Sequence, residues 1–129
     1  MEIQLAIASA FTEKERAGFG TEITSAHGHI CVLTGGQYSP CKHSVTEFVV
    51  DETKRGKGYG VELVKEIIRR YHSDIGGQVS SPASLVAFYK CGFRPAMKQK
   101  VTLPEALALF KDEWGSLLMV YKPAQNFEE

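Results

Sequence analysis

A run of glycines and basic residues is the segment of this chain best suited to chemistry. It reads Arg55-Gly56-Lys57-Gly58-Tyr59-Gly60 and lies between a β-branched, apolar segment and an amphipathic one. Glycine carries no side chain, so a ligand can approach the backbone closely. A helix starting here would present unpaired N–H groups and the positive end of its dipole, and Arg55 and Lys57 add positive charge. The segment therefore predicts a site for an anion such as phosphate.

Two common phosphate-binding motifs do not fit this loop. The Walker motif requires a Lys followed by Ser or Thr, whereas Lys57 is followed by Gly58. The dinucleotide fingerprint requires a three-residue step between its second and third glycines, whereas Gly58 and Gly60 are two positions apart. From the residues alone, a turn that only connects a strand to a helix remains the other explanation.

Other polar residues could do chemistry, but their patterns are weaker. His27, His29 and Cys31 would share one face of a strand, as metal ligands can. Three ligands without a clear fourth are better explained by ordinary strand alternation, so we expect no metal. Cys91 is expected in an apolar setting at a helix end, where a thiol is more often inert packing than a nucleophile.

The elements that must position the loop are the clearest in the sequence. Val45–Val50 is rich in β-branched and aromatic residues and predicts a strand. After the loop, apolar residues recur at helical spacing up to Tyr71 and predict an amphipathic helix of about four turns. We expect Gly76 and Gly77 to end this helix, and Gln78–Ser80 to form a short strand.

The rest of the chain is predicted to alternate strands and helices. Thr12 followed by Glu15 resembles a capping box and predicts a short helix ending near Gly18 or Gly20. Further strands are expected at Ile3–Ile7, Ile30–Leu33 and Leu117–Tyr121, and further helices from Pro82 to Gly92 and from Pro104. This order predicts an α/β (α+β) fold with a single mixed, largely antiparallel sheet flanked by helices.

Composition limits the class of protein. The 129 residues fit one domain spanning 1–129, and 15 basic against 15 acidic side chains give a formal net charge of zero. A strongly basic surface for nucleic acid or for a membrane is therefore not expected. The start lacks the basic region of a signal peptide, and no apolar run approaches the roughly 18 residues of a membrane span. Three cysteines without paired spacing are expected to stay reduced, so we expect a cytoplasmic protein.

The loop and its surroundings resemble the GNAT superfamily of N-acetyltransferases. Arg55-x-x-Gly58-x-Gly60, with Gly56, is similar to the pyrophosphate motif of that family, and Ala87–Phe93 is similar to its helix-to-strand segment ending in Gly-Phe. The resemblance covers Val45–Phe93 well and both flanks only in outline. It implies a GNAT-like fold and acetyl-CoA as the co-substrate.

The resemblance also implies which residues bind acetyl-CoA. The strand ending at Val50 would bind the pantetheine arm through the backbone of Phe48, Val49 and Val50. Phe88, on the helix from Pro82 to Tyr89, would flank the end of the cofactor. The pyrophosphate would be held by the amides of Arg55, Gly56, Lys57, Gly58, Tyr59, Gly60 and Val61.

The catalytic residues are less determined. The family places a tyrosine, which protonates the leaving thiolate, four positions before the Gly of Gly-Phe; here that position is Phe88, and Tyr89 follows it. Because one residue turns a helical side chain by about 100°, either Tyr89 still reaches the sulfur or Phe88 fills the site and no side-chain acid acts. Glu47, the nearest carboxylate on the strand Val45–Val50, is the candidate base, although alternation places it on the opposite face from Phe48 and Val50. Asp51, Glu52, His43 and a water relay are alternatives.

The resemblance implies direct acetyl transfer from acetyl-CoA to a primary amine in a ternary complex. The alternative is a non-catalytic module that binds acetyl-CoA or another protein, which the shifted tyrosine would favour. A nucleotide-phosphate binder of another class would need a Ser or Thr linked to Mg²⁺, or an acidic residue that binds ribose, at the right spacing. The sequence offers neither in a convincing context. The acceptor is expected to enter beside Phe11–Thr24 and Arg94–Gly115, and a second subunit in a homodimer could complete its pocket.

Overall fold

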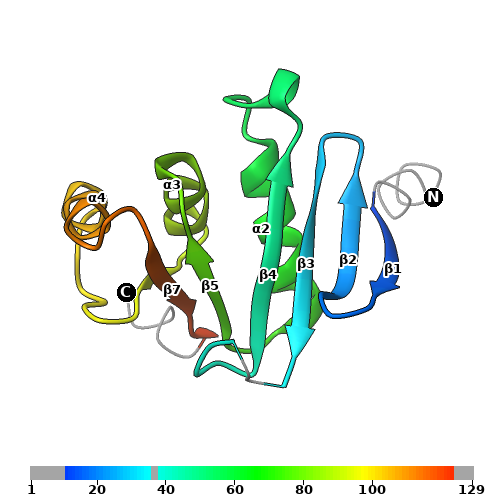
Figure 1. The fold of residues 1–129 in the computed structure, drawn as a ribbon, viewed down its shortest axis with the longest axis horizontal. Helices are drawn as coiled ribbons and strands as arrows, with labels where there is room; N and C mark the ends of the chain where they lie inside the picture. The colour runs from blue at the N-terminus through cyan, green and yellow to red at the C-terminus, as the bar shows by residue number, and fades with distance from the viewer. Residues whose placement is uncertain (1–10, 36–37, 124–129) are drawn as a thin grey trace.

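The described part of the chain forms one seven-stranded mixed sheet with helices packed against it (Figure 1). The computed structural model describes residues 11–35 and 38–123. The strand order is β1-β2-β3-β4-β5-β7-β6, and every neighbouring pair is antiparallel except β4 with β5. This confirms the predicted fold class. The strands are β1 (Thr12–Arg16), β2 (Gly20–Ser25), β3 (Gly28–Thr34), β4 (His43–Val50), β5 (Ile75–Val79), β6 (Arg94–Pro95) and β7 (Leu117–Tyr121).

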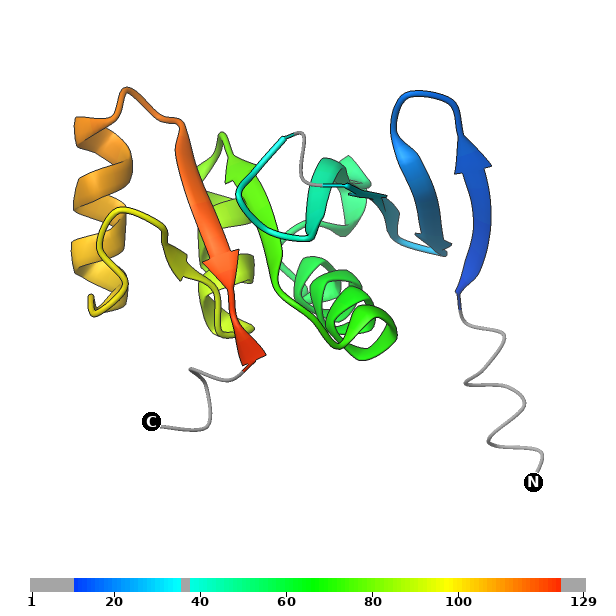
Figure 2. The ribbon, with the colours of Figure 1, turned by 90° about the horizontal axis from the view of Figure 1, so that it is seen from below.

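The helices bury their apolar sides against the sheet. A short 3-10 helix, η1 (Glu52–Lys54), precedes α2 (Tyr59–Tyr71), and α3 (Pro82–Lys90) and α4 (Leu103–Asp112) follow. Viewed from below, α2 and α3 lie on the same face of the sheet, while α4 lies at the end beyond β7 (Figure 2). Leu63, Val64 and Ile67 of α2 are fully buried with Phe88 and Phe93 in one hydrophobic cluster. Removing this apolar surface from water is the main force that holds the helices in place.

The segments around the loop form as predicted. The strand expected at Val45–Val50 is β4, and the amphipathic helix after the loop is α2. The predicted helices after Pro82 and Pro104 are α3 and α4, each with a capping box and a proline in its first turn. None of the helices in the described part of the chain is long and apolar enough to cross a membrane.

The prediction of a helix starting at Thr12 is wrong. Thr12–Arg16 is β1, which pairs with β2 from Thr12 opposite Thr24 to Arg16 opposite Gly20. Gly18 and Gly20 have φ of +83° and +93° and reverse the chain, so that Arg16 donates to Glu22 across the hairpin at 2.9 Å. The strand β2 was not predicted. The strand expected at Ile3–Ile7 lies outside the described residues.

Gly76 and Gly77 do not end the helix, which is a second correction. The helix α2 ends at Tyr71, because His72 adopts a left-handed conformation with φ of 48° and caps it. Both glycines lie inside β5, which begins at Ile75 rather than Gln78. Gly77 has a packing reason: a Cβ there would lie 2.4 Å from a carbon of the Phe88 ring.

Candidate active site

The sheet opens between β4 and β5. The two strands pair only from His43 opposite Ile75 to Val45 opposite Gly77. Beyond that point β4 continues to Val50 and β5 to Val79 without a shared ladder, as far as the described residues go. A bulge in β4 starts there, since Val45 pairs with Val32 and Glu47 with Cys31, leaving Thr46 as an extra residue. The edge of β4 that faces β5 therefore presents unpaired backbone groups.

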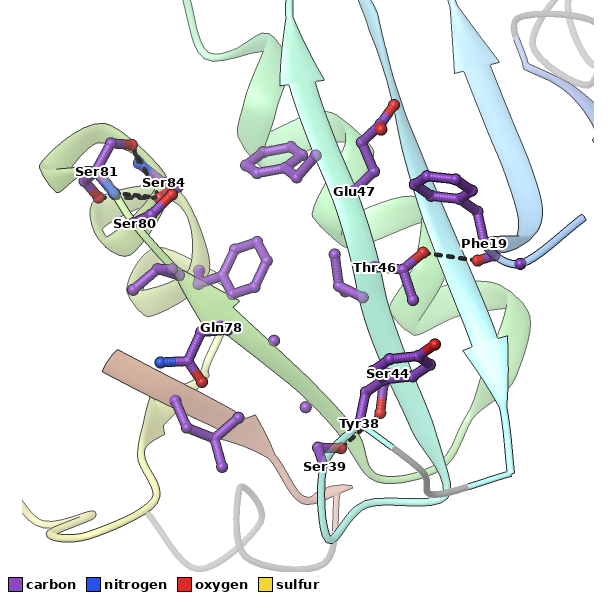
Figure 3. A pocket seen from close by; sticks show the side chains of 18 residues that line it. Phe19, Tyr38, Ser39, Ser44, Thr46, Glu47, Gln78, Ser80, Ser81 and Ser84 are labelled. Atoms are coloured by element: carbon purple, nitrogen blue, oxygen red, sulfur yellow. Dashed lines mark hydrogen bonds between the residues drawn. The ribbon is translucent and has the colours of Figure 1, made fainter. Parts of the chain in front are cut away.

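A cavity of about 670 Å³ occupies this opening, and we call it the strand cavity (Figure 3). Its walls come from β4, β5, the start of α3 and the segments around Phe19 and Tyr38. Its lining is rich in hydroxyl groups, and several are already partnered: Ser39 and Ser44 are 2.7 Å apart, and Thr46 donates to the Phe19 carbonyl at 2.6 Å. The lining residues include Phe19, Tyr38, Ser39, Ser44, Thr46, Glu47, Phe48, Gln78, Ser80, Ser81, Ser84 and Phe88.

A second cavity, of about 490 Å³, lies between the glycine-rich loop and α3, and we call it the loop cavity. It shares Phe48, Ser81 and Ser84 with the strand cavity. The two cavities therefore have one boundary in common, formed where β4 approaches the start of α3. The other lining residues are Val49, Val50, Lys54, Arg55, Gly56, Gly58, Tyr59, Gly60, Val61, Ala83, Val86, Ala87 and Lys90.

The loop cavity has the features of a phosphate cradle. Gly56 and Gly58 have φ of +81° and +85°, and a Cβ added to either would meet no described atom within 4 Å. Gly58 is the N-cap of α2 and gives no side-chain cap, so the first N–H groups of the helix are left for a ligand. The open backbone and the positive end of the helix dipole fit the pyrophosphate of coenzyme A.

The remaining loop residues support this cradle in different ways. Arg55 donates from Nε to the Val50 carbonyl at 3.0 Å, which ties the loop to the end of β4. The Tyr59 ring stacks on His27 with centroids 3.5 Å apart. Gly60 lets α2 start close to β4, since a Cβ there would lie 3.1 Å from Phe48. Lys57 is exposed and is the one loop residue that does not line the loop cavity.

Phe88 and Tyr89 point to different surroundings. Phe88 is 2% exposed, lines the strand cavity and packs against Phe48 with ring centroids 5.4 Å apart. Tyr89 lines neither cavity among the described residues; its hydroxyl donates to the Val101 carbonyl at 2.7 Å, and Arg94 lies 3.7 Å over its ring. Of the two alternatives left by the sequence, the one in which Phe88 occupies the tyrosine position fits this geometry.

Glu47 lies in a cluster of charged residues beside the strand cavity. Its Oε2 accepts hydrogen bonds from Arg16, at 3.0 Å, and from His29. These two bonds, His29 first, hold the pKa of the Glu47 carboxyl below its usual value. A carboxylate that is stabilised in its ionised form is a weak proton acceptor.

The alternative bases lie away from the boundary between the cavities. His43 is buried and bonds through Nδ1 to the Thr34 hydroxyl at 2.8 Å, and burial, with the nearby Lys42 charge, lowers its pKa. Asp51 and Glu52 are exposed at η1 and line neither cavity among the described residues.

The histidines and Cys31 do not converge. His29 bonds to Glu47, and His27 stacks on Tyr59. Cys31 is buried, and its sulfur accepts a hydrogen bond from the Arg16 guanidinium at 3.4 Å. Within residues 11–35 and 38–123, no group of three or more His, Cys, Asp or Glu side chains is placed to hold a metal ion.

The sequence analysis missed four residues around the strand cavity. Arg16 was placed in a helix, which hid its approach to Glu47 from β1. Ser81 and Ser84 form the capping box of α3, a signal that was visible in Ser81 before Pro82. Tyr38 lies in a predicted loop and carries no pattern that would mark it.

Comparison with known proteins gives one family and a common fold. A family model described as "Acetyltransferase (GNAT) family" matches residues 6–93. No curated protein matches the chain. Among solved structures, N-acetylglutamate synthase from Neisseria gonorrhoeae, in complex with coenzyme A and N-acetyl-glutamate, aligns with a TM-score of 0.51 and 16% identity. That alignment covers 94% of this chain and 27% of the synthase, so this chain spans about a quarter of the synthase's length. IAA acetyltransferase from Bacillus cereus ATCC 14579 aligns with a TM-score of 0.54 and 15% identity, over 95% of this chain and 85% of that one.

Proposed function

Because the chain belongs to the GNAT acetyltransferase family, we propose that it transfers the acetyl group of acetyl-CoA to a primary amine, directly and within a ternary complex. The observation that carries the proposal is the common boundary of the two cavities at Phe48, Ser81 and Ser84. A co-substrate in the loop cavity and an acceptor in the strand cavity would meet at that boundary. The complex of gonococcal N-acetylglutamate synthase with coenzyme A supports the same co-substrate on this fold.

The loop cavity would hold the co-substrate mainly through backbone groups. The N–H groups from Gly56 to Val61 would bind the pyrophosphate, and the part of β4 without a ladder to β5, at Phe48, Val49 and Val50, would bind the pantetheine arm. When bound, acetyl-CoA supplies an acetyl group on a thioester, which an amine can attack. A backbone N–H of β4 near Val49 or Val50 would polarise the thioester carbonyl.

Proton transfer in this site would rely on water more than on a side chain. Phe88 has no proton to give, and the Tyr89 hydroxyl is engaged by Val101. The lowered pKa of Glu47 makes its carboxylate a weak base. We therefore propose that water takes the proton from the attacking amine and that the leaving thiolate takes its proton from water. Alignment of the two reactants would supply most of the rate.

The bond between Tyr89 and Val101 favours a second candidate function. A protein without a side-chain acid could bind acetyl-CoA without turning it over and serve as a binding or interaction module.

Calorimetry and a turnover assay would separate the two candidates. The reduced protein is first titrated with acetyl-CoA, and with ATP and NAD as controls, and is then assayed for thiol release with a panel of primary amines. Selective acetyl-CoA binding with amine-dependent release supports the enzyme. Selective binding without release with any amine favours the binding module, and absence of acetyl-CoA binding would overturn both.

A further inference from the structure

The strand cavity has a charge pattern that restricts its ligand. We infer that it takes the acceptor and selects a positively charged amine that carries no carboxylate, such as an alkyl diamine. This inference rests on the proposed function for the transfer step, but the charge preference itself can be tested by binding alone.

Glu47 provides the only charge among the described residues that line this cavity. The rest of the lining consists of glycine, apolar, aromatic, hydroxyl and amide groups, with no Lys or Arg among them. A cationic amine would find a counter-ion here. A ligand carboxylate would lose its water without gaining a cation, which is unfavourable.

One oxygen of Glu47 is available to a ligand. Both Arg16 and His29 bond to Oε2, and Oε1 has no hydrogen-bond partner among the described residues. In the described part of the chain, every buried side-chain oxygen or nitrogen has a hydrogen-bond partner, so Oε1, which has none, is not buried. The Glu47 side chain as a whole is 29% exposed. Oε1 can therefore be reached and can accept a hydrogen bond from an ammonium group.

Arg16 does not bind Glu47 alone. Its guanidinium is shared between Glu47, at 3.0 Å, and Glu22, at 2.9 Å. Lys14 lies 4.0 Å from the other oxygen of Glu22, so these two cations and two carboxylates balance as a group. Of these four described residues, only Glu47 lines the cavity, and its lowered pKa keeps its carboxylate ionised at neutral pH. The cavity therefore presents a negatively charged oxygen to a ligand at its Glu47 end.

Tyr38 adds a second feature suited to a cation. It is 62% exposed and lines the cavity, and Ser39, the next residue, bonds to Ser44 at the end of the cavity away from Glu47 (Figure 3). Ser44 and Phe48 are four residues apart on β4, so the cavity extends for about 13 Å along the strand. An aromatic face attracts cations, so Tyr38 could hold the ammonium group that is not acetylated. The amine at the Glu47 end would be the one that gives its proton to water and then attacks the thioester.

The test compares two acceptors that differ only in a carboxylate. Thiol release from acetyl-CoA is measured with 1,5-diaminopentane and with lysine on the unmodified protein. We expect kcat/KM to be at least about tenfold higher for the diamine than for lysine, because the lysine carboxylate would have no cation to pair with among the described residues of the cavity. Glu47→Gln should reduce this preference severalfold, whereas Glu113→Gln, an exposed carboxylate at the end of α4, should leave it unchanged.

Equal or better use of lysine would overturn the inference, and so would an unchanged preference in Glu47→Gln. If the Glu47→Gln protein does not fold, the comparison on the unmodified protein still decides. If acetyl-CoA binds but no acceptor turns over, both amines are titrated by calorimetry into the protein loaded with coenzyme A. If acetyl-CoA does not bind, the proposed function fails, and the same titrations without coenzyme A test the charge preference. In either titration, tighter binding of the diamine than of lysine supports the inference. Equal affinity for the two amines, or no binding of either, overturns it.

Discussion

Phe88 and Tyr89 are neighbours in sequence and have different surroundings in the fold. The Phe88 ring is buried between Phe48 and Phe93, while the Tyr89 hydroxyl reaches the segment before α4. The sequence shows an aromatic pair before Gly92 but not which member faces the sheet, because the end of a helix can shift by a residue. The contacts of Tyr89 are those of a residue that fastens α3 to the chain at Val101.

Tyr89→Phe is expected to change stability and not catalysis. It removes the hydrogen bond to the Val101 carbonyl, which should lower the free energy of unfolding by about 1 kcal/mol. Urea unfolding measures that loss, and thiol release at several pH values measures the rate. A large fall in kcat with unchanged stability would instead place the Tyr89 hydroxyl in the reaction.

Gly58 combines a positive φ with an open position over the loop cavity. Gly58→Leu should therefore cost about 1 kcal/mol in backbone strain and should weaken acetyl-CoA binding at least about tenfold by filling the cradle. Gly115→Leu is the matched control, because Gly115 has φ of +78° and lies in neither cavity. Calorimetry with both folded variants gives the comparison. Parent-like affinity in Gly58→Leu would contradict the placement of the pyrophosphate.

Among the elements, β5 shows most clearly how packing decides structure. Its second and third residues are glycine, which lacks the side chains that usually favour strands. Ser39 and Phe88 occupy the space above Gly76 and Gly77, so larger residues would collide with them. A pattern of residue types cannot reveal this reason, since Ser39 comes from the loop before β4 and Phe88 from the helix after β5.

Gly77→Ala is expected to displace the Phe88 ring. The added methyl group should destabilise the protein by about 2 kcal/mol through overpacking. The double variant Gly77→Ala with Phe88→Leu should recover part of that loss, because a smaller side chain leaves room for the methyl group. Thermal or urea unfolding of the two single variants and the double variant measures the coupling. Additive losses would show that the two residues do not compete for the same space.

The elements nearest the loop were predictable because local signals agree there. In Val45–Val50 and in α2, propensity and periodicity predict the same structure that packing produces. Thr12–Arg16 is different: its polar residues suit a helix locally, and only pairing with β2 makes it a strand. The approach of Arg16 to Glu47 depends on that pairing, so this part of the site could not be derived from the sequence.

At the scale of the whole molecule, the three cysteines report on how well the core is closed. Cys31 and Cys41 are buried, and Cys91 is partly buried with its thiol directed at the Val61 carbonyl. Burial raises the pKa of all three thiols, that of Cys91 to about 11. Because the thiolate is the reactive form, the native protein should react slowly with thiol reagents.

A colorimetric disulfide reagent at pH 8 tests this expectation. The native protein should be labelled slowly, and three thiols per chain should react rapidly in denaturant, in line with the three cysteines of the sequence. The same result would give a low background in the thiol-release assay. Rapid labelling of one thiol in the native state would show that its surroundings open far more readily than these contacts indicate.

The short ladder between β4 and β5 has a further consequence for motion. The sheet consists of two antiparallel halves, β1–β4 and β5–β7, that share hydrogen bonds at one end only. Beyond Val45 and Gly77 no ladder joins β4 to β5 in the described part of the chain, so the angle between the two halves can change by small amounts without breaking a hydrogen bond between them. A molecule seated between the halves would restrict this bending, so part of its binding energy would be spent on lost conformational entropy. Amide hydrogen exchange along β5 should therefore slow when acetyl-CoA is bound, even at residues that do not touch it.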